Sequence, residues 1–370
     1  MGHKFLRWLR SDGVSHTGSV QNLVFNFVDS NKRVGSWIYP MLSGKSLSWL
    51  VQRGNIDDAT AIASTLIRWQ QGSKDGKLAR SYGAFPSKIE SAAGGTWKAN
   101  DYFYTGDNLV ILAGLLALYG KTKDADLLNA AIGIGTWIVE VMCKGHELGV
   151  WAEDHGAPMY MVRASGDFAN EIHTAEAMLW ISALDRLGTI TNEPAFCSQA
   201  ERASRFYLGS QTQNGVFLDR YDPGYPAKPY DAGRWKPYQP GQIVADSLLR
   251  SALGACRWGE LARARKLFDW MKTENGAVPA FLDTTSGGAG FPPNQHVYYD
   301  VTSSGLHRSL ATWLGDKKAA EVDQAFLRKT QQASGGWYWG AYRNNLAPVD
   351  AQLAPIAGFW ATADLSIEVG

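Results

Sequence analysis

The chain has 370 residues, and its 36 Lys and Arg residues against 35 Asp and Glu residues leave a formal net charge of +1 at pH 7. No long basic run is present, so neither nucleic acid nor an anionic membrane surface is expected as the main partner. No segment approaches the roughly 20 apolar residues that a membrane-spanning helix needs.

The cysteines and the N-terminal residues indicate which cellular compartment the protein occupies. Cys143, Cys197 and Cys256 are odd in number and far apart, which argues against a disulfide framework or a Cys-x-x-Cys metal site. The segment from Met1 to Arg10 alternates basic and apolar residues and lacks the apolar stretch and cleavage site of a signal peptide. A cytoplasmic location is therefore favoured, and secretion stays open.

One unit recurs with a period of about 60 residues, which is long enough for two helices and a loop. The predicted helix pairs are 42–52 with 56–71, 107–119 with 123–143, 172–187 with 193–211, 241–258 with 260–274, and 301–314 with 317–334. A last helix over 350–363 has no room for a partner, which residues 5–10 or 20–28 would supply. The glycines that end the units are Gly83, Gly149, Gly215, Gly276 and Gly335.

The apolar pattern divides these helices into two layers. Residues 107–119 are apolar almost throughout, which is typical of a helix buried on all sides. We therefore assign the first helix of each pair to an inner ring and the second to an outer ring. About six pairs, each buried against its neighbours, can close into a ring. Long loops near 86–100, 151–170, 218–240, 283–299 and 338–349 then meet over a central cavity.

This layout resembles the (α/α)6-toroid proteins, a group that includes glycoside hydrolases, unsaturated-uronyl hydrolases, polysaccharide lyases, sugar epimerases and prenyl-cyclase toroids. The resemblance covers nearly the whole chain and rests on the repeat, because no diagnostic motif fixes a subfamily. It implies an all-α toroid that forms a single domain over residues 1–370. It also implies a cleft for carbohydrate at the N-terminal ends of the inner helices.

Acids and aromatics crowd the loop before the second inner helix. Trp97, Asp101, Tyr104 and Asp107 all lie there. Asp107 is a candidate catalytic carboxylate. It is equally a candidate for an acid of the first helical turn, whose carboxylate accepts hydrogen bonds from free backbone N–H groups. Asp101 lies farther into the loop and is a freer catalytic candidate.

The loop before the third inner helix carries Trp151, Asp154 and His155, followed by Glu171 and His173. Acids and a His beside a Trp suit acid–base chemistry next to a stacked sugar, and a solvated loop is the alternative. Glu171 either caps the helix or points into the cavity. A metal site that joins His155 and His173 to the acid at position 176 matches no known ligand spacing, so neither a metal nor a cofactor is predicted.

The fourth loop carries Arg234, Trp235 and Tyr238, which would hold an acidic sugar by charge and stacking. Trp337, at the end of the fifth unit, is a further stacking candidate. In such a protein each Trp is about as likely to fill space between helices as to bind a sugar.

The fifth loop ends in His296, Tyr298 and Asp300. His296 and Tyr298 are candidates for proton transfer or substrate binding. Asp300 directly precedes an inner helix, so it is either a catalytic acid or an N-cap.

Two carboxylates flank the scissile bond in most glycosidases, and Asp101, Asp107, Asp154, Glu171 and Asp300 offer such a pair. A lyase instead needs a cation or amide, such as Arg234 or Asn170, and a His or Tyr that takes the α-proton. We favour a glycoside hydrolase acting on an oligo- or polysaccharide, with uronic-acid-containing glycans included, because acids recur at more of the loops. A lyase, a sugar epimerase and a non-catalytic glycan-binding toroid stay as alternatives, and the sequence does not specify the oligomeric state.

Overall fold

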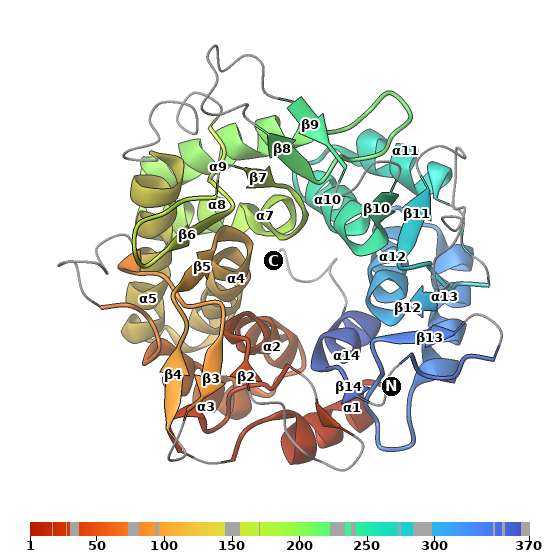
Figure 1. The fold of residues 1–370 in the computed structure, drawn as a ribbon, viewed down its shortest axis with the longest axis horizontal. Helices are drawn as coiled ribbons and strands as arrows, with labels where there is room; N and C mark the ends of the chain where they lie inside the picture. The colour runs from red at the N-terminus through yellow and green to blue at the C-terminus, as the bar shows by residue number, and fades with distance from the viewer. Residues whose placement is uncertain are drawn as a thin grey trace.

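A computed structural model describes residues 1–16, 18–26, 28–29, 37–72, 81–92, 96–144, 156–169, 171–222, 234–237, 242–271, 273, 275–283, 298–342, 345–349 and 352–363. Within these residues, helices form two concentric rings (Figure 1). The inner ring holds α2 (Pro40–Gln52), α4 (Thr105–Thr122), α7 (Ala175–Trp180) continued by α8 (Ser182–Thr191), α10 (Ala245–Arg257), α12 (Val301–Trp313) and α14 (Pro355–Thr362). Each inner helix contacts the next, and α14 contacts α2, so the inner ring closes.

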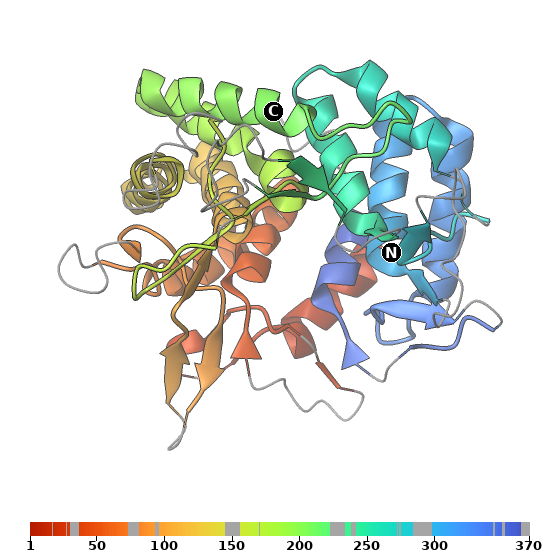
Figure 2. The ribbon, with the colours of Figure 1, turned by 45° about the horizontal axis from the view of Figure 1, so that its top comes forward.

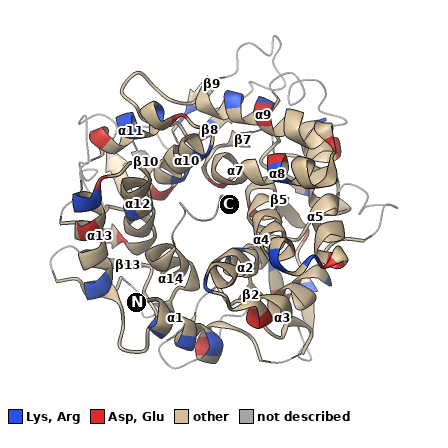
Figure 3. Cartoon of the chain, turned by 180° about the vertical axis from the view of Figure 1, so that it is seen from behind, with Lys and Arg blue, Asp and Glu red and all other residues tan. Residues whose placement is uncertain are grey.

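The outer ring consists of the second helix of each pair. Its members are α1 (Gly2–Trp8), α3 (Ile56–Ile67), α5 (Ala125–Trp137) with its π-helical extension η5 (Ile138–Cys143), α9 (Pro194–Leu208), α11 (Leu261–Trp270) and α13 (Lys317–Thr330). Figure 3 shows the charged residues gathered mainly on these outer helices, while the inner helices are mostly uncharged. The fold is therefore the (α/α)6 toroid that the resemblance implied.

The N-terminal segment completes the sixth pair. Phe5 of α1 packs edge-on against Phe359 of α14, with 5.3 Å between ring centroids. The strand β1 (Val28–Asp29) pairs with β14 (Gln352–Leu353), which directly precedes α14. Both N-terminal segments considered from the sequence contribute, because α1 supplies the outer helix and the end of the second segment starts the strand. Two short turns, η1 (Leu9–Gly13) and η2 (Gly18–Val20), lie between them.

Short antiparallel strands, which the all-α prediction did not include, gather at one end of the ring (Figure 2). A strand precedes each inner helix and pairs with the strand after the outer helix of the same unit. The pairs are β2 (Trp37–Ile38) with β3 (Ile89–Ser91), β5 (Tyr102–Tyr104) with β6 (Met161–Arg163), β7 (Ile172–His173) with β8 (Arg220–Asp222), β10 (Gln242–Val244) with β11 (Phe281–Asp283), and β12 (Tyr298–Asp300) with β13 (Gly340–Tyr342). Third strands β4 (Trp97–Ala99) and β9 (Arg234–Lys236) extend two of these sheets. Strands of two or three residues are too short to show an alternating pattern in the sequence.

The repeated glycine at the end of each unit has a structural cause. It has a positive φ, between +80° and +107° at the four described repeat positions, which L-residues with side chains rarely adopt. It also lies against the backbone of the next outer helix. A Cβ would come within 2.3 to 2.8 Å of that helix at Gly83, Gly215, Gly276 and Gly335.

The second unit departs from the prediction. Gly149 lies outside the described residues, and Gly156 has the repeated features instead. Its φ is +77°, and a Cβ there would lie 2.8 Å from Cβ of Arg202 on α9. The sequence "Gly-Ala-Pro" at 156–158 thus carries the repeated features in this unit.

Glycines also let the inner helices approach one another closely. A Cβ on Gly114 of α4 would lie 2.1 Å from the carbonyl oxygen of Gly44 on α2. A Cβ on Gly254 of α10 would lie 2.6 Å from the carbonyl oxygen of Met178 on α7. Backbone thus contacts backbone between neighbouring helices of the inner ring.

Several predicted boundaries shift. The expected helix at 172–187 starts as a strand, becomes helical at Ala175 and is interrupted at Ile181. The stretch Ala125–Cys143 is long and apolar enough to cross a membrane, contrary to the expectation from the sequence. More than half of it is buried in the ring, and a single such helix is weak evidence for a membrane span because core helices pass the same test. All three cysteines are free.

Candidate active site

Two cavities meet at the N-terminal end of α4, where the strands converge. The larger, of 800 Å³, is lined by Tyr39, Tyr102, Tyr104 and Asp107 and by the polar residues Ser87, Lys88, Glu90, Lys98, Asn100 and Asp101. The smaller, of 260 Å³, runs from Gly106 past Tyr160, His173 and Glu176 to Arg220 and Ser247. Their position at the N-terminal ends of the inner helices is where the resemblance placed a cleft.

One buried arginine interacts with three carboxylates at this end of the ring. Arg250, on the second turn of α10, is only 8% exposed. It forms ion pairs with Glu176 in the first turn of α7 and with Asp246 one turn before it, at 3.0 Å from the Asp246 carboxylate. The positive charge of Arg250 also acts on Asp107, in the first turn of α4, where it lowers the pKa of the carboxyl group against the larger opposing effect of burial. Gly106 brings α4 close, since a Cβ there would lie 2.8 Å from Cβ of Glu176.

Burial makes two of these carboxyl groups weak acids. It raises the pKa of Asp107 from 3.8 to about 7, against the opposing effect of Arg250. Burial, with a smaller contribution from the Asp300 charge, also raises the pKa of Asp246 to about 7. Both carboxyl groups therefore titrate near neutrality, where a general acid of a hydrolase has to titrate.

A stability measurement tests the raised pKa of Asp107. Because the folded state binds this proton more tightly than the unfolded chain, the stabilisation is complete below about pH 4 and is lost as the pH rises to about 7. We expect the free energy of unfolding of Asp107→Asn to fall less than that of the wild type between about pH 5 and about pH 7, by at most about 1.4 kcal/mol per pH unit. Urea unfolding across this range measures it, and equal slopes would mean that water in the cavity keeps the pKa near its usual value.

A histidine and a tyrosine form the wall of the smaller cavity. The His173 ring stacks on Tyr160, with 3.6 Å between ring centroids and an interplanar angle of 15°. Nε2 of His173 lies 3.0 Å from Glu171, and Arg220 lies 3.6 Å from the other oxygen of that carboxylate. The close approach of His173, opposed by burial, lowers the pKa of Glu171. Glu171 is thus an ionised partner that orients His173 beside the cavity.

Asp300 takes the N-cap role, one of the two roles that the sequence allowed for it. Asp300 is the N-cap of α12, and its carboxylate accepts hydrogen bonds from the backbone N–H groups of Thr302 and Ser303, each at 3.0 Å. The Ser303 hydroxyl donates a third hydrogen bond. At 4% exposure this carboxylate has its acceptor sites engaged by the helix that it starts.

The stacking role predicted for Trp337 is corrected. The side chain is completely buried, and its indole N–H donates to the carbonyl oxygen of Leu327 at 3.0 Å. Trp337 packs against Phe5 in the core where α1 closes the ring. No face of this indole is open to a sugar.

The other candidates are divided between the cavity, its surroundings and the undescribed residues. Asp101 and Tyr104 line the larger cavity with Asp107. Tyr298 lies close enough to Asp246 for that charge to raise its pKa, although burial is the larger cause. Trp97 and Trp235 line neither cavity, and Trp235 packs on Phe206 and Tyr221. Trp151, Asp154, His155, Tyr238, His296 and the Arg234 side chain lie outside the described residues.

Sequence reasoning missed Asp246, Arg250, Tyr160 and Arg220 altogether, and it considered Glu176 only as a metal ligand. One signal was available: Asp107, Glu176 and Asp246 each stand in the first turn of successive inner helices. A carboxylate at a helix N-terminus is favoured by the helix dipole. The acid recurs in the first turn of three successive inner helices. This recurrence at one end of the ring would have pointed to the cluster.

Alternating cations and indole rings connect the acid cluster to the interior of the ring. The Arg250 guanidinium lies 5.7 Å from the Trp360 ring. The Lys45 ammonium, on a side chain only 2% exposed, lies 4.3 Å from Trp360 and 4.5 Å from Trp180. Arg257 follows at 4.3 Å from Trp180. The ring faces replace part of the hydration that these cations lose, and they help to hold Arg250 in place.

No protein-family model and no curated protein matches the sequence. Solved structures match the fold over nearly the whole chain. A D-mannose isomerase superposes with a TM-score of 0.71 at 14% identity and covers 99% of this chain and 95% of its own. A novel alpha-amylase from Clostridium perfringens has a TM-score of 0.69 at 12% identity, covering 98% and 96%. The cellobiose 2-epimerase from Bacillus thermoamylovorans B4167 has a TM-score of 0.68 at 10% identity, covering 97% of each chain. These identities establish the fold, and the named activities differ from one neighbour to the next.

Proposed function

We propose that this protein is a glycoside hydrolase whose catalytic carboxylates are Asp107 and Asp246. The observation that carries the proposal is their arrangement: Asp107 lines the larger cavity from the first turn of α4, and Asp246, in the first turn of α10, pairs with the buried Arg250, whose charge also acts on Asp107. Structural neighbours named as an alpha-amylase and an endo-beta-1,4-glucanase support a glycan as substrate. The larger cavity has a size common for ligand sites.

Within the pair, Asp107 acts as the general acid. It lines the larger cavity, and burial keeps it protonated up to about pH 7, so that it can donate its proton to the glycosidic oxygen as the C–O bond breaks. Asp246, whose carboxylate lies 3.0 Å from Arg250, is the partner that reacts in its ionised form. It receives a proton from the attacking water or attacks the anomeric carbon itself.

The walls of the larger cavity suit a sugar ring. Tyr39, Tyr102 and Tyr104 present aromatic faces, and Lys88, Asn100 and Asp101 present hydrogen-bonding groups. Flat apolar faces beside donors and acceptors match the two kinds of surface on a pyranose. This lining supports an oligo- or polysaccharide as the substrate.

An activity screen tests the proposal. Purified protein is incubated with a panel of neutral and acidic glycans, while new reducing ends and near-ultraviolet absorbance are followed together. A hydrolase releases reducing ends without absorbance. Absorbance that rises with the reducing ends would reject hydrolysis in favour of a lyase, whose product carries a C=C bond conjugated to a carboxylate.

A sugar isomerase or epimerase is the second candidate, and His173 favours it. A His that is oriented by a carboxylate and lines a cavity can remove a proton next to a sugar carbonyl. The D-mannose isomerase and the epimerases among the structural neighbours support this reading.

Deuterium exchange separates the two candidates. In D2O an isomerase or epimerase incorporates solvent deuterium at the carbon next to the carbonyl, which NMR detects, and His173→Asn should reduce this exchange by about 10²-fold or more. The exposed His16 supplies the control variant His16→Asn, which should leave exchange unchanged. Hydrolysis of a glycan without such exchange would leave His173 as a residue of the cavity wall only.

A further inference from the structure

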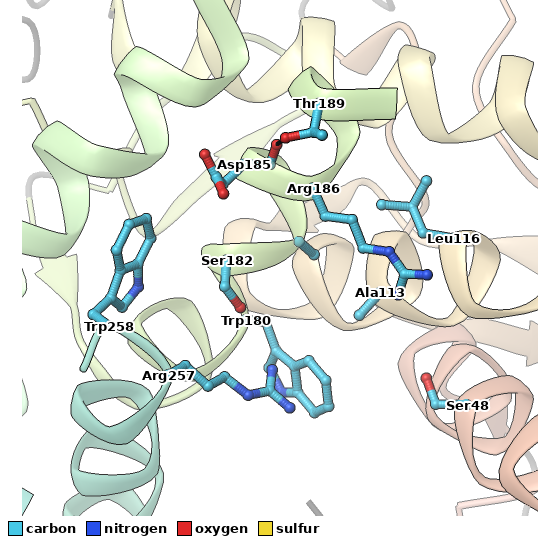
Figure 4. A pocket seen from close by; sticks show the side chains of 11 residues that line it. Ser48, Ala113, Leu116, Trp180, Ser182, Asp185, Arg186, Thr189, Arg257 and Trp258 are labelled. Carbon is cyan, nitrogen blue, oxygen red and sulfur yellow. Dashed lines mark hydrogen bonds between the residues drawn. The ribbon is translucent and has the colours of Figure 1, made fainter. Parts of the chain in front are cut away.

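A separate cavity lies at the opposite end of the inner ring. Its volume is 310 Å³, and residues of α2, α4, the α7–α8 segment and the end of α10 line it (Figure 4). Trp258 is the C-cap of α10, whereas Asp246 stands in the first turn of the same helix. A helix of this length separates the two ends by about 20 Å, so this cavity is not part of the candidate active site.

Arginine and tryptophan donors make up much of the polar lining of this far cavity, together with three hydroxyl groups and the acid Asp185. Arg186 and Arg257 contribute guanidinium groups, and Trp180 and Trp258 contribute indole N–H groups. Both indole nitrogens are buried without a hydrogen-bond partner, and the Trp180 side chain is only 2% exposed. A buried donor that is left without an acceptor is costly, so the cavity favours a ligand that brings acceptor atoms.

Arg186 is a cation without a counter-ion. No acid among the described residues forms an ion pair with it, and burial lowers its pKa, which reflects the cost of holding its charge there. Burial raises the pKa of the Cys197 thiol on α9, and the neighbouring Asp185 adds to this rise. In Figure 4 the Asp185 carboxylate and the Arg186 guanidinium extend to opposite sides of α8.

We propose that the far cavity is a second ligand site, which binds a small oxyanion through Arg186, Arg257 and the indole N–H groups of Trp180 and Trp258. The hydroxyl of Ser182 lies between these donors and is available to a ligand oxygen (Figure 4). The shared chemistry is a phosphate or carboxylate group on a small molecule, since a planar guanidinium pairs with either. This site is independent of the proposed glycosidase activity.

Titration calorimetry with the full chain tests the site, using inorganic phosphate and malonate as probes and glucose as the neutral control. We expect one saturable site for at least one anion and none for glucose. The more tightly bound anion identifies the source as phosphoryl or carboxylate. Arg186→Gln should weaken binding by about tenfold or more, because a charge-assisted contact is lost.

A control variant outside the cavity and a second variant within it complete the test. Arg205→Gln removes an exposed charge on α9 and should bind like the wild type. Ser182→Asp places a negative charge in the cavity at the first position of α8, which tolerates an acid, and should abolish binding. The absence of saturable binding by either anion, or equal binding by wild type, Arg186→Gln and Ser182→Asp, would overturn the proposal. Equal weakening in Arg186→Gln and Arg205→Gln would also overturn it, by attributing binding to overall charge.

Discussion

Asp107→Asn and Asp246→Asn should each lower the turnover of a cleaved glycan by about 10² to 10⁴-fold. The amide is nearly isosteric with the carboxyl group, but it cannot donate the proton that Asp107 supplies or carry the charge of Asp246. Because Asp246→Asn weakens the ion pair with the buried Arg250, its melting temperature should fall more than that of Asp107→Asn. Steady-state kinetics on the substrate found by the screen, with thermal unfolding of the same samples, measures both.

The outer ring supplies a matched control for these variants. Asp126 stands in the first turn of α5, as Asp107 does in α4, but it is exposed on the outside of the ring. Asp126→Asn should therefore retain wild-type turnover. If Asp107→Asn or Asp246→Asn keeps its activity, or loses activity only in proportion to lost stability, the acid in question stabilises the helix N-terminus and is not catalytic.

Gly276→Ala should be among the most destabilising single substitutions in the protein. Gly276 has a φ of +80°, and its added Cβ would lie 2.5 Å from the carbonyl oxygen of Val322 on α13. The positive φ costs an alanine about 1–2 kcal/mol, and the forced backbone shift adds about 1–3 kcal/mol. Chemical denaturation monitored by tryptophan fluorescence gives the change in the free energy of unfolding.

Gly259 isolates the contribution of the close approach. Its φ of +77° is almost the same, but no atom lies within 4 Å of an added Cβ. Gly259→Ala should therefore cost only the backbone term, about 1–2 kcal/mol. Equal losses in the two variants would contradict our view that the repeated glycine is required by contact with the outer helix.

The sequence was sufficient to predict the ring because the ring depends on local and periodic properties. Apolar inner helices, amphipathic outer helices and a glycine at each unit's end recur every 60 residues or so, and each leaves its mark within a short window. The same reasoning anticipated that the N-terminal residues complete the last pair, since residues 350–363 had no partner. It failed at the strands, which form by pairing between segments far apart in the chain, and it did not identify Gly156, which lies against α9.

The candidate site was only partly predictable. Asp107 was identified as a site residue because it follows an aromatic loop, and Asp300 was assigned to the site on similar grounds. In the structure, Asp107 lines a cavity, whereas the Asp300 carboxylate is engaged by the first turn of α12. A first-turn acid and an N-cap acid look alike in a sequence, because both positions favour carboxylates for the same electrostatic reason.

The sequence by itself determined the helix pairs, their inner and outer assignment and the end of the ring at which acids and aromatics gather. Only the tertiary structure decided which carboxylates share Arg250, because Glu176 and Arg250 are 74 residues apart and meet only once the ring is assembled. The tertiary structure also distinguished the buried Trp337 from the indoles that line a cavity, which the sequence could not do. Burial and ion pairing arise from the packing of distant segments, and no local pattern records them.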